Sequence, residues 1–205
     1  MTLKALIPLP ALVMTVAALM LPVPAAHAIP ITFQLNLSGA QEVPPVTPAG
    51  TGSATVVLDP TVQTLQISAT FSGLTSNTTA AHIHCCQPLG TNAIVATLLP
   101  AFPDFPLGVT SGTYPLHVLD LTLASSYNPA FITAHGGTVA QAEADLITGI
   151  LGAQSYLNIH TVTNPGGEIR AQLPEPGTLA LLGSGLVGIG LFWKRKRFMR
   201  KRAAV

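Results

Sequence analysis

The stretch Ile31-Thr32-Phe33-Gln34-Leu35-Asn36-Leu37-Ser38 alternates apolar and polar side chains without a break. Neighbouring side chains on a β-strand point to opposite faces, so this period of two predicts a strand with one face in a core and one in water. Residues 65–71 repeat the alternation. The middle of the chain is therefore predicted to be rich in β-structure.

Six further segments are candidate strands, and turn residues such as Asp59-Pro60 and the Asn164-Pro165-Gly166-Gly167 run separate them. They are residues 53–58, 80–85, 93–98, 112–123, 155–161 and 168–173. Short strands at this spacing predict a mainly β fold, an antiparallel β-sandwich with Greek-key-like connections.

One short helix interrupts the strand pattern. Thr138 followed by Gln141 predicts a capping box, and Gly152 is a plausible stop. Between them, Val139, Ala142, Leu146 and Ile150 lie along one helical face. We expect this helix to pack over one end of the sandwich.

Composition divides the 205 residues into three parts. The chain is 48% hydrophobic and 8% charged, and the apolar excess lies in residues 5–21 and 178–193. Between the ends, residues 29–173 have ordinary polarity, and about 145 residues are enough for one domain with one core.

Charge is distributed unevenly along the chain. Seven of the nine basic residues lie in the last twelve positions, and Arg170 is the only cation between residues 29 and 173. Seven carboxylates in that range give it a formal charge of −6. An acidic domain with one arginine cannot replace the counterions around phosphates, so nucleic-acid binding is excluded.

The first 28 residues are predicted to be a signal peptide. Lys4 precedes the apolar stretch, and Ala26-His27-Ala28 supplies a small-x-small site with cleavage after Ala28. The alternative is an uncleaved anchor helix. Four prolines within residues 8–24 argue against it, because proline breaks a spanning helix.

The last 32 residues are predicted to anchor the chain. Pro174-Glu175-Pro176 precedes an apolar span over residues 178–193, and the basic run 194–205 stays cytoplasmic by the positive-inside rule. The triplet, the glycine-rich span and the basic cluster resemble the PEP-CTERM sorting signal. That resemblance implies a Gram-negative bacterium that makes exopolysaccharide, processing by a membrane-embedded exosortase, and release from the inner membrane to the surface. The alternative is an ordinary single-span anchor.

Residues 29–173 resemble the CHRD domain, named after chordin, in four motifs that occur in family order. The motifs are Leu37 to Pro45, Ala80-Ala81-His82-Ile83-His84, Asn158-Ile159-His160-Thr161, and Asn164 to Arg170. The resemblance implies an extracellular β-domain of poorly defined activity. The chain departs from the family where Cys85 and Cys86 replace the usual glycine after His-Ile-His.

Three histidines are candidate metal ligands. His82 and His84 share a face of one predicted strand, and His160 lies on a late strand. If those strands are neighbours, three imidazoles converge, which suits Cu or Zn, with the fourth position open or filled by Glu168 or Glu42. A structural histidine network is the alternative. His117 and His135 are interpreted as surface or turn residues.

Cys85 and Cys86 are the only cysteines of an exported chain, so three states are open. They are a vicinal disulfide, which we favour, a Cys86 thiolate as a metal ligand, and a disulfide between chains. Glu168 and Arg170, two apart on one face, are expected to form a mutual ion pair.

The sequence shows no nucleophile elbow, no phosphate-binding loop and no carboxylate pair at acid–base spacing. We therefore favour a non-enzymatic binding or structural protein of the cell surface, with polysaccharide or other surface proteins as partners. The alternative is an extracellular domain that binds Cu or Zn through its histidines and has redox activity.

Overall fold

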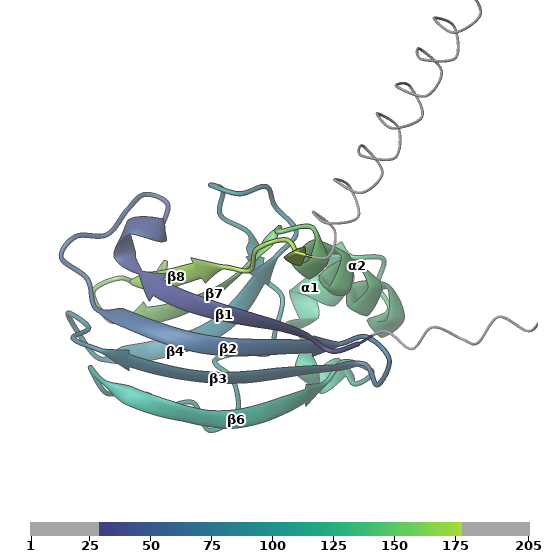
Figure 1. Ribbon diagram of the computed structural model, residues 1–205, viewed down its shortest axis with the longest axis horizontal. Helices are drawn as coiled ribbons and strands as arrows, with labels where there is room; N and C mark the ends of the chain where they lie inside the picture. The colour runs from purple at the N-terminus through teal and green to yellow at the C-terminus, as the bar shows by residue number, and fades with distance from the viewer. Residues whose placement is uncertain (1–28, 178–205) are drawn as a thin grey trace, which may run out of the picture.

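The computed structural model describes residues 29–177; the predicted signal peptide, the apolar span 178–193 and the basic tail lie outside the described residues. Within residues 29–177 eight strands form one antiparallel sheet in the order β5-β4-β7-β8-β1-β2-β3-β6 (Figure 1). The strands are β1 (Ile31–Ser38), β2 (Thr51–Asp59), β3 (Thr64–Ser72), β4 (Thr78–Cys85), β5 (Ile94–Val95), β6 (Gly112–Asp120), β7 (Ser155–Thr161) and β8 (Ile169–Gln172).

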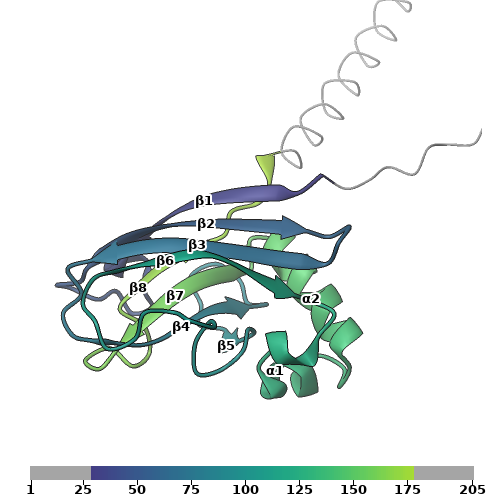
Figure 2. The ribbon, with the colours of Figure 1, turned by 90° about the horizontal axis from the view of Figure 1, so that it is seen from below.

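The expectation of a mainly β, antiparallel fold is confirmed, but the division into two sheets is wrong. The sheet is continuous, and it curls so that β1-β2-β3-β6 lies over β4-β7-β8 (Figure 2). The two halves join at β1 and β8, where the only register pair is Ser38 with Arg170. Alternation predicts which side chains face inward, and it does not report whether the two layers share a hydrogen-bonded edge.

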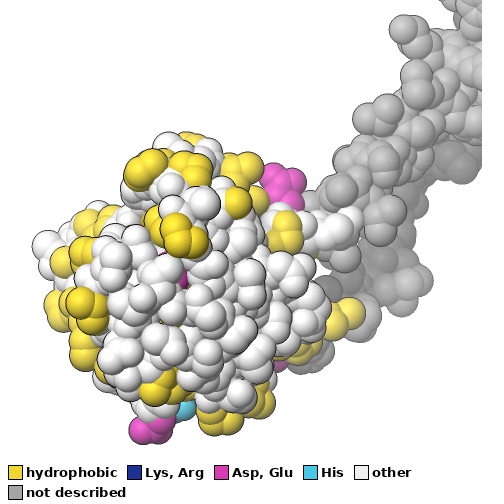
Figure 3. Space-filling view, turned by 90° about the vertical axis from the view of Figure 1, so that its left-hand side faces the viewer, with side chains coloured by type: hydrophobic (Ala, Val, Ile, Leu, Met, Phe, Trp, Pro, Cys, Tyr) yellow, Lys and Arg dark blue, Asp and Glu magenta, His cyan; other side chains and the backbone are white. Residues whose placement is uncertain are grey.

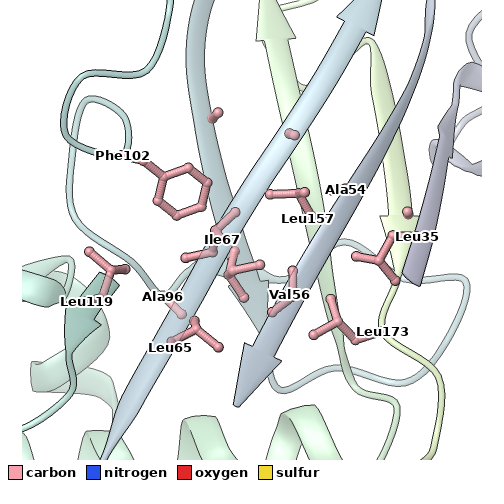
Figure 4. Close-up of a cluster of buried hydrophobic side chains, with 14 of the residues drawn as sticks. Leu35, Ala54, Val56, Leu65, Ile67, Ala96, Phe102, Leu119, Leu157 and Leu173 are labelled. Carbon is pink, nitrogen blue, oxygen red and sulfur yellow. The ribbon is translucent and has the colours of Figure 1, made fainter. Parts of the chain in front are cut away.

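Inward side chains from both halves of the sheet form the core. Val56 of β2, Ile67 of β3 and Leu157 of β7 meet between the layers (Figure 4) and are at most 1% exposed. Leu119 and Phe102 extend this cluster toward β6 and the loop after β5. The period of two in residues 31–38 and 65–71 is thus the consequence of one buried and one solvated face.

Most predicted strands keep their bounds to within two residues, and two are shorter than predicted by three residues or more. The segment 93–98 forms a strand only over Ile94–Val95, because Leu98 then bonds to Ser126 and Asn128 bonds back to the backbone of Val95 and Ala96. β6 ends at Asp120, whose carboxylate accepts from the backbone and hydroxyl of Thr122 and closes a turn.

Two α-helices, rather than the single predicted one, cover one end of the curled sheet (Figure 2). Helix α2 (Val139–Leu151) begins as predicted, since Thr138 Oγ1 accepts from the backbone of Gln141. The side chain of Gln141 bonds to Asp145 instead of returning to the cap. Helix α1 (Pro129–Ala134) was not predicted; Asn128 caps it and Pro129 begins it.

Among residues 29–177 the structure contains no helix long and apolar enough to cross a membrane.

Gly149 on α2 is the position where the helix contacts the Cys85–Cys86 pair, and a Cβ added there would meet both sulfurs. We expect Gly149→Ala to lower the free energy of unfolding by about 1–2 kcal/mol, because overpacking outweighs the roughly 1 kcal/mol gain in helix propensity. Urea denaturation measures the change. The control is Ala144→Gly at an exposed position of the same helix, expected to cost about 1 kcal/mol. A Gly149→Ala protein as stable as the parent would show that the contact is not tight.

Candidate metal centre

The antiparallel pairing of β4 with β7 brings three imidazoles together. In the register His82 lies opposite Asn158 and His84 opposite Tyr156, so His160 is diagonal to His82. All three histidines are buried, with exposed fractions of 4%, 6% and 7%. Their ligand atoms lie within 4.8 Å of one another, although residues 82 and 160 are far apart in sequence.

One ring nitrogen of each histidine bonds to a backbone carbonyl from a covering loop. His82 Nε2 donates to Pro100 O at 2.7 Å, and His84 Nδ1 donates to Ala93 O at 2.8 Å. His160 Nδ1 donates to Pro165 O at 3.0 Å. Because a carbonyl oxygen only accepts, each of these nitrogens carries the hydrogen. The three carbonyls therefore fix the tautomer of each neutral ring.

The three remaining nitrogens face one another as bare lone pairs. His160 Nε2 lies 3.4 Å from His82 Nδ1 and 3.3 Å from His84 Nε2. A tetrahedral ion with metal–nitrogen bonds of about 2.0–2.1 Å places its ligand atoms about 3.3–3.4 Å apart. The two separations from His160 Nε2 match that spacing, and all three ligand atoms lie within 4.8 Å of one another. The donor set of three neutral imidazoles suits Zn or Cu.

Burial keeps the three rings neutral. It lowers the pKa of His82 to about 4, an effect to which the neighbouring His160 and His84 add. Burial likewise lowers the pKa of His84 to about 4, and it lowers the pKa of His160. A metal must displace any proton from its ligand, so low pKa values favour binding near neutral pH.

A stack of side chains supports the outer side of His84. The Tyr156 ring lies parallel to the His84 ring, at 7° and 4.8 Å between centroids, and the guanidinium of Arg170 lies 4.5 Å from the Tyr156 centroid. The Tyr156 hydroxyl accepts from the backbone of Ala93, whose carbonyl holds His84. This stack was not predicted from the sequence. The only indication of it is the alternation that places residues 156, 158 and 160 on one face of the strand.

The carboxylates predicted as a fourth ligand are engaged elsewhere. Glu168 is fully buried and accepts hydrogen bonds from Gly50, Thr75, Thr161 and Asn164. Although burial alone would raise its pKa, these bonds hold the pKa of Glu168 below its ordinary value.

Glu42 contacts Arg170 instead, at 3.7 Å between carboxylate and guanidinium. Burial raises the pKa of Glu42 to about 7, an effect that the Arg170 charge opposes. The predicted ion pair between Glu168 and Arg170 is therefore wrong; Arg170 also bonds to Gln41 and Asn92. Alternation places Glu168 and Arg170 on one face. It does not predict that Glu42, in a loop near the start of the domain, contacts Arg170 instead.

Cys85 and Cys86 are joined to each other by a disulfide, so Cys86 is not a thiolate ligand in this structure and neither sulfur is free to pair with another chain. The pair lies under α2, where both sulfurs contact the carbonyl of Asp145. Of the other histidines, His135 stacks on Phe131 and pairs with Asp145. His117 is half-buried on β6 and stacks on Tyr114.

Comparisons with known proteins give two family matches. The model described as the CHRD domain matches residues 33–173, and the model described as the PEP-CTERM protein-sorting motif matches residues 172–196. No curated protein and no solved structure gives a significant match.

The pKa shifts predict how pH affects the metal-free protein. Unfolded histidines bind protons below their ordinary pKa of 6.5, whereas folded His82 and His84 resist protonation down to about 4. Stability should therefore fall as pH is lowered from 6.5 toward 4. Glu42 acts in the opposite direction, because its raised pKa makes stability fall as pH rises from 4.5 to about 7. The three histidines outnumber this single carboxyl group, so the net effect is lower stability at low pH.

Urea midpoints measured across this range test the expectation. The His82→Gln/His160→Gln protein should show a clearly shallower pH dependence, and His117→Gln should keep the parent slope. A midpoint that does not change with pH in the parent would contradict the low pKa values.

Proposed function

The chain belongs to the CHRD domain family, and on that premise we propose that it carries to the bacterial surface a domain that binds one Cu or Zn ion through His82, His84 and His160. The PEP-CTERM motif indicates export and membrane-associated sorting in Gram-negative bacteria, with processing by an exosortase. The chain is thus an exported, surface-sorted protein, and the metal is the new element of the proposal.

One observation carries the metal proposal: three unprotonated nitrogens converge, and each ring's other nitrogen donates to a carbonyl. Histidine ligands of metals typically have such an outer partner, which fixes the tautomer and the ring orientation. A purely structural network would need a hydrogen between the facing nitrogens. Adding one requires an imidazolium, which the burial of His82 and His84 opposes.

The chemistry of the donor set limits the metal. Imidazole suits Zn and Cu, whereas Mg and Ca require oxygen ligands. Glu42, Glu168 and Cys86 are engaged elsewhere, so the described residues supply three ligands, as in sites that keep one position for water or another small molecule. Redox activity would accompany Cu and not Zn.

The proposed partners follow from the export of the domain to the cell surface. We place the mature domain outside the inner membrane, transiently held by the span over residues 178–193, with exopolysaccharide and other surface proteins as its surroundings. We assign it a binding or structural role there rather than an enzymatic one.

Metal analysis tests the centre. The full chain, purified in detergent, stripped with a chelator and loaded separately with Cu(II) and Zn(II), should retain about one equivalent after desalting. The His82→Gln/His84→Gln/His160→Gln protein should retain none, while His117→Gln should behave as the parent. If the parent holds neither metal, or if the triple variant holds it equally well, the centre is not a metal site.

Intact mass of the protein released from the surface tests the sorting proposal. We expect a chain that begins at Ile29 and lacks the basic run 194–205, because processing at the Pro174-Glu175-Pro176 segment removes the tail. Pro174→Ala/Pro176→Ala should leave the chain in the membrane fraction at its longer mass. Released protein that retains the basic run would contradict processing.

A further inference from the structure

The outer face of the β1-β2-β3-β6 layer carries hydroxyl and amide side chains in rows that run across the strands. Asn36, Ser53, Thr70 and Thr113 are in direct register on four neighbouring strands. Two further rows flank this one: Gln34, Thr55 and Ser68 on one side, and Ser38, Thr51 and Ser72 on the other. No charged residue occupies any of the three rows.

The rows line a shallow, open groove. A depression of about 880 Å³ lies over the Asn36 and Ser38 rows, and a second of about 330 Å³ lies over the Gln34 row. Ser53, Thr70 and Thr113 line both, so the two hollows form one groove. The groove belongs to β1-β2-β3-β6, whereas the histidines lie on β4 and β7 in the other layer.

The side chains in the groove are held in place and still have bonding capacity. Ser53 and Thr70 hydroxyls share a hydrogen bond of 2.9 Å, and Thr55 donates to Gln34 at 3.0 Å. A hydroxyl can donate one hydrogen bond and accept two, and an amide does both. Such a surface matches a ligand that itself presents many hydroxyl groups.

Charge excludes the main alternative ligands. Arg170 is the sole cation in residues 29–177 and is 3% exposed, so no Lys or Arg is available to hold phosphate, sulfate or uronate groups. The end face in Figure 3 accordingly shows acidic side chains and no Lys or Arg. The aromatic lining residues Phe71 and Tyr114 are buried, so the groove has no exposed aromatic ring on which a sugar could stack.

We propose that this groove binds a neutral polysaccharide. The proposal rests on the delivery of the domain to the surface, where such a polymer would be met. Without an exposed aromatic platform, each sugar is held by hydrogen bonds alone, so binding to one unit is weak. The overall affinity comes from contacts repeated along the polysaccharide and from many copies of the protein bound to one polysaccharide molecule.

Affinity electrophoresis of the full chain in detergent tests the groove directly. Native gels contain a neutral β-glucan, a dextran, a galactomannan or, as the polyanion, alginate. We expect retardation by at least one neutral polymer and none by alginate. Ser53→Ala/Thr70→Ala removes two exposed hydroxyls from the centre of the groove and should weaken retardation about 5-fold or more.

Two controls separate this proposal from the others. Gln66→Ala changes a polar residue on the same face but outside the groove and should bind as the parent does. The triple histidine variant should also bind the polymer normally, so loss of metal binding and loss of polymer binding are distinguishable. Because the gels use purified protein, their result does not depend on whether the chain is sorted to the cell surface. The proposal is overturned if no neutral polymer retards the chain, if alginate does so equally, or if the groove variant behaves as the parent does.

Discussion

The pairing of β4 with β7 is the constraint on which the centre depends. One face of this pair is core: Ala81 and Ile83 on β4, and Ile159 on β7, are fully buried. Shifting the register by one residue would turn those side chains to the other face. The core therefore fixes the register, and the register places His82, His84 and His160 together on the opposite face. The hydrophobic effect, acting on residues that never touch the centre, sets its geometry.

Buried polar contacts then hold the loops that complete the centre. Glu168 joins the start of β2, the β3–β4 loop and the end of β7 by accepting from Gly50, Thr75 and Thr161. The same end of β7 leads into the turn whose Pro165 carbonyl fixes the tautomer of His160. Gly167 has a φ of +126°, and the amide of Asn158 occupies the place where a Cβ would lie. A buried carboxylate without these donors would be costly, so the loops and the carboxylate stabilise one another.

Local patterns in the sequence predict local structure well here, and contacts between distant segments poorly. Alternation in residues 31–38 gives β1 with its bounds, and the Thr138 cap gives the start of α2. Helix α1 was missed because six residues are too few for a helical period to show, although Asn128-Pro129 is a start signal. The sequence predicts that His160 meets His82 and His84 only if their strands are neighbours, since no local pattern reports which strands pair. The partner of Arg170 was assigned wrongly for the same reason: Glu42 reaches it through the fold, across most of the domain's sequence.

The metal centre and the groove are independent features of one delivered domain, since they lie on different layers of the curled sheet. The centre depends on three carbonyl bonds that turn the lone pairs of three imidazoles toward one point. Long-range ¹H–¹⁵N spectra of the imidazoles, recorded before and after one equivalent of Zn(II), test this arrangement directly. We expect a hydrogen on Nε2 of His82 and on Nδ1 of His84 and His160, with zinc shifting the resonance of the other nitrogen of all three. A different tautomer at any of the three rings, or nitrogens unmoved by zinc, would contradict it.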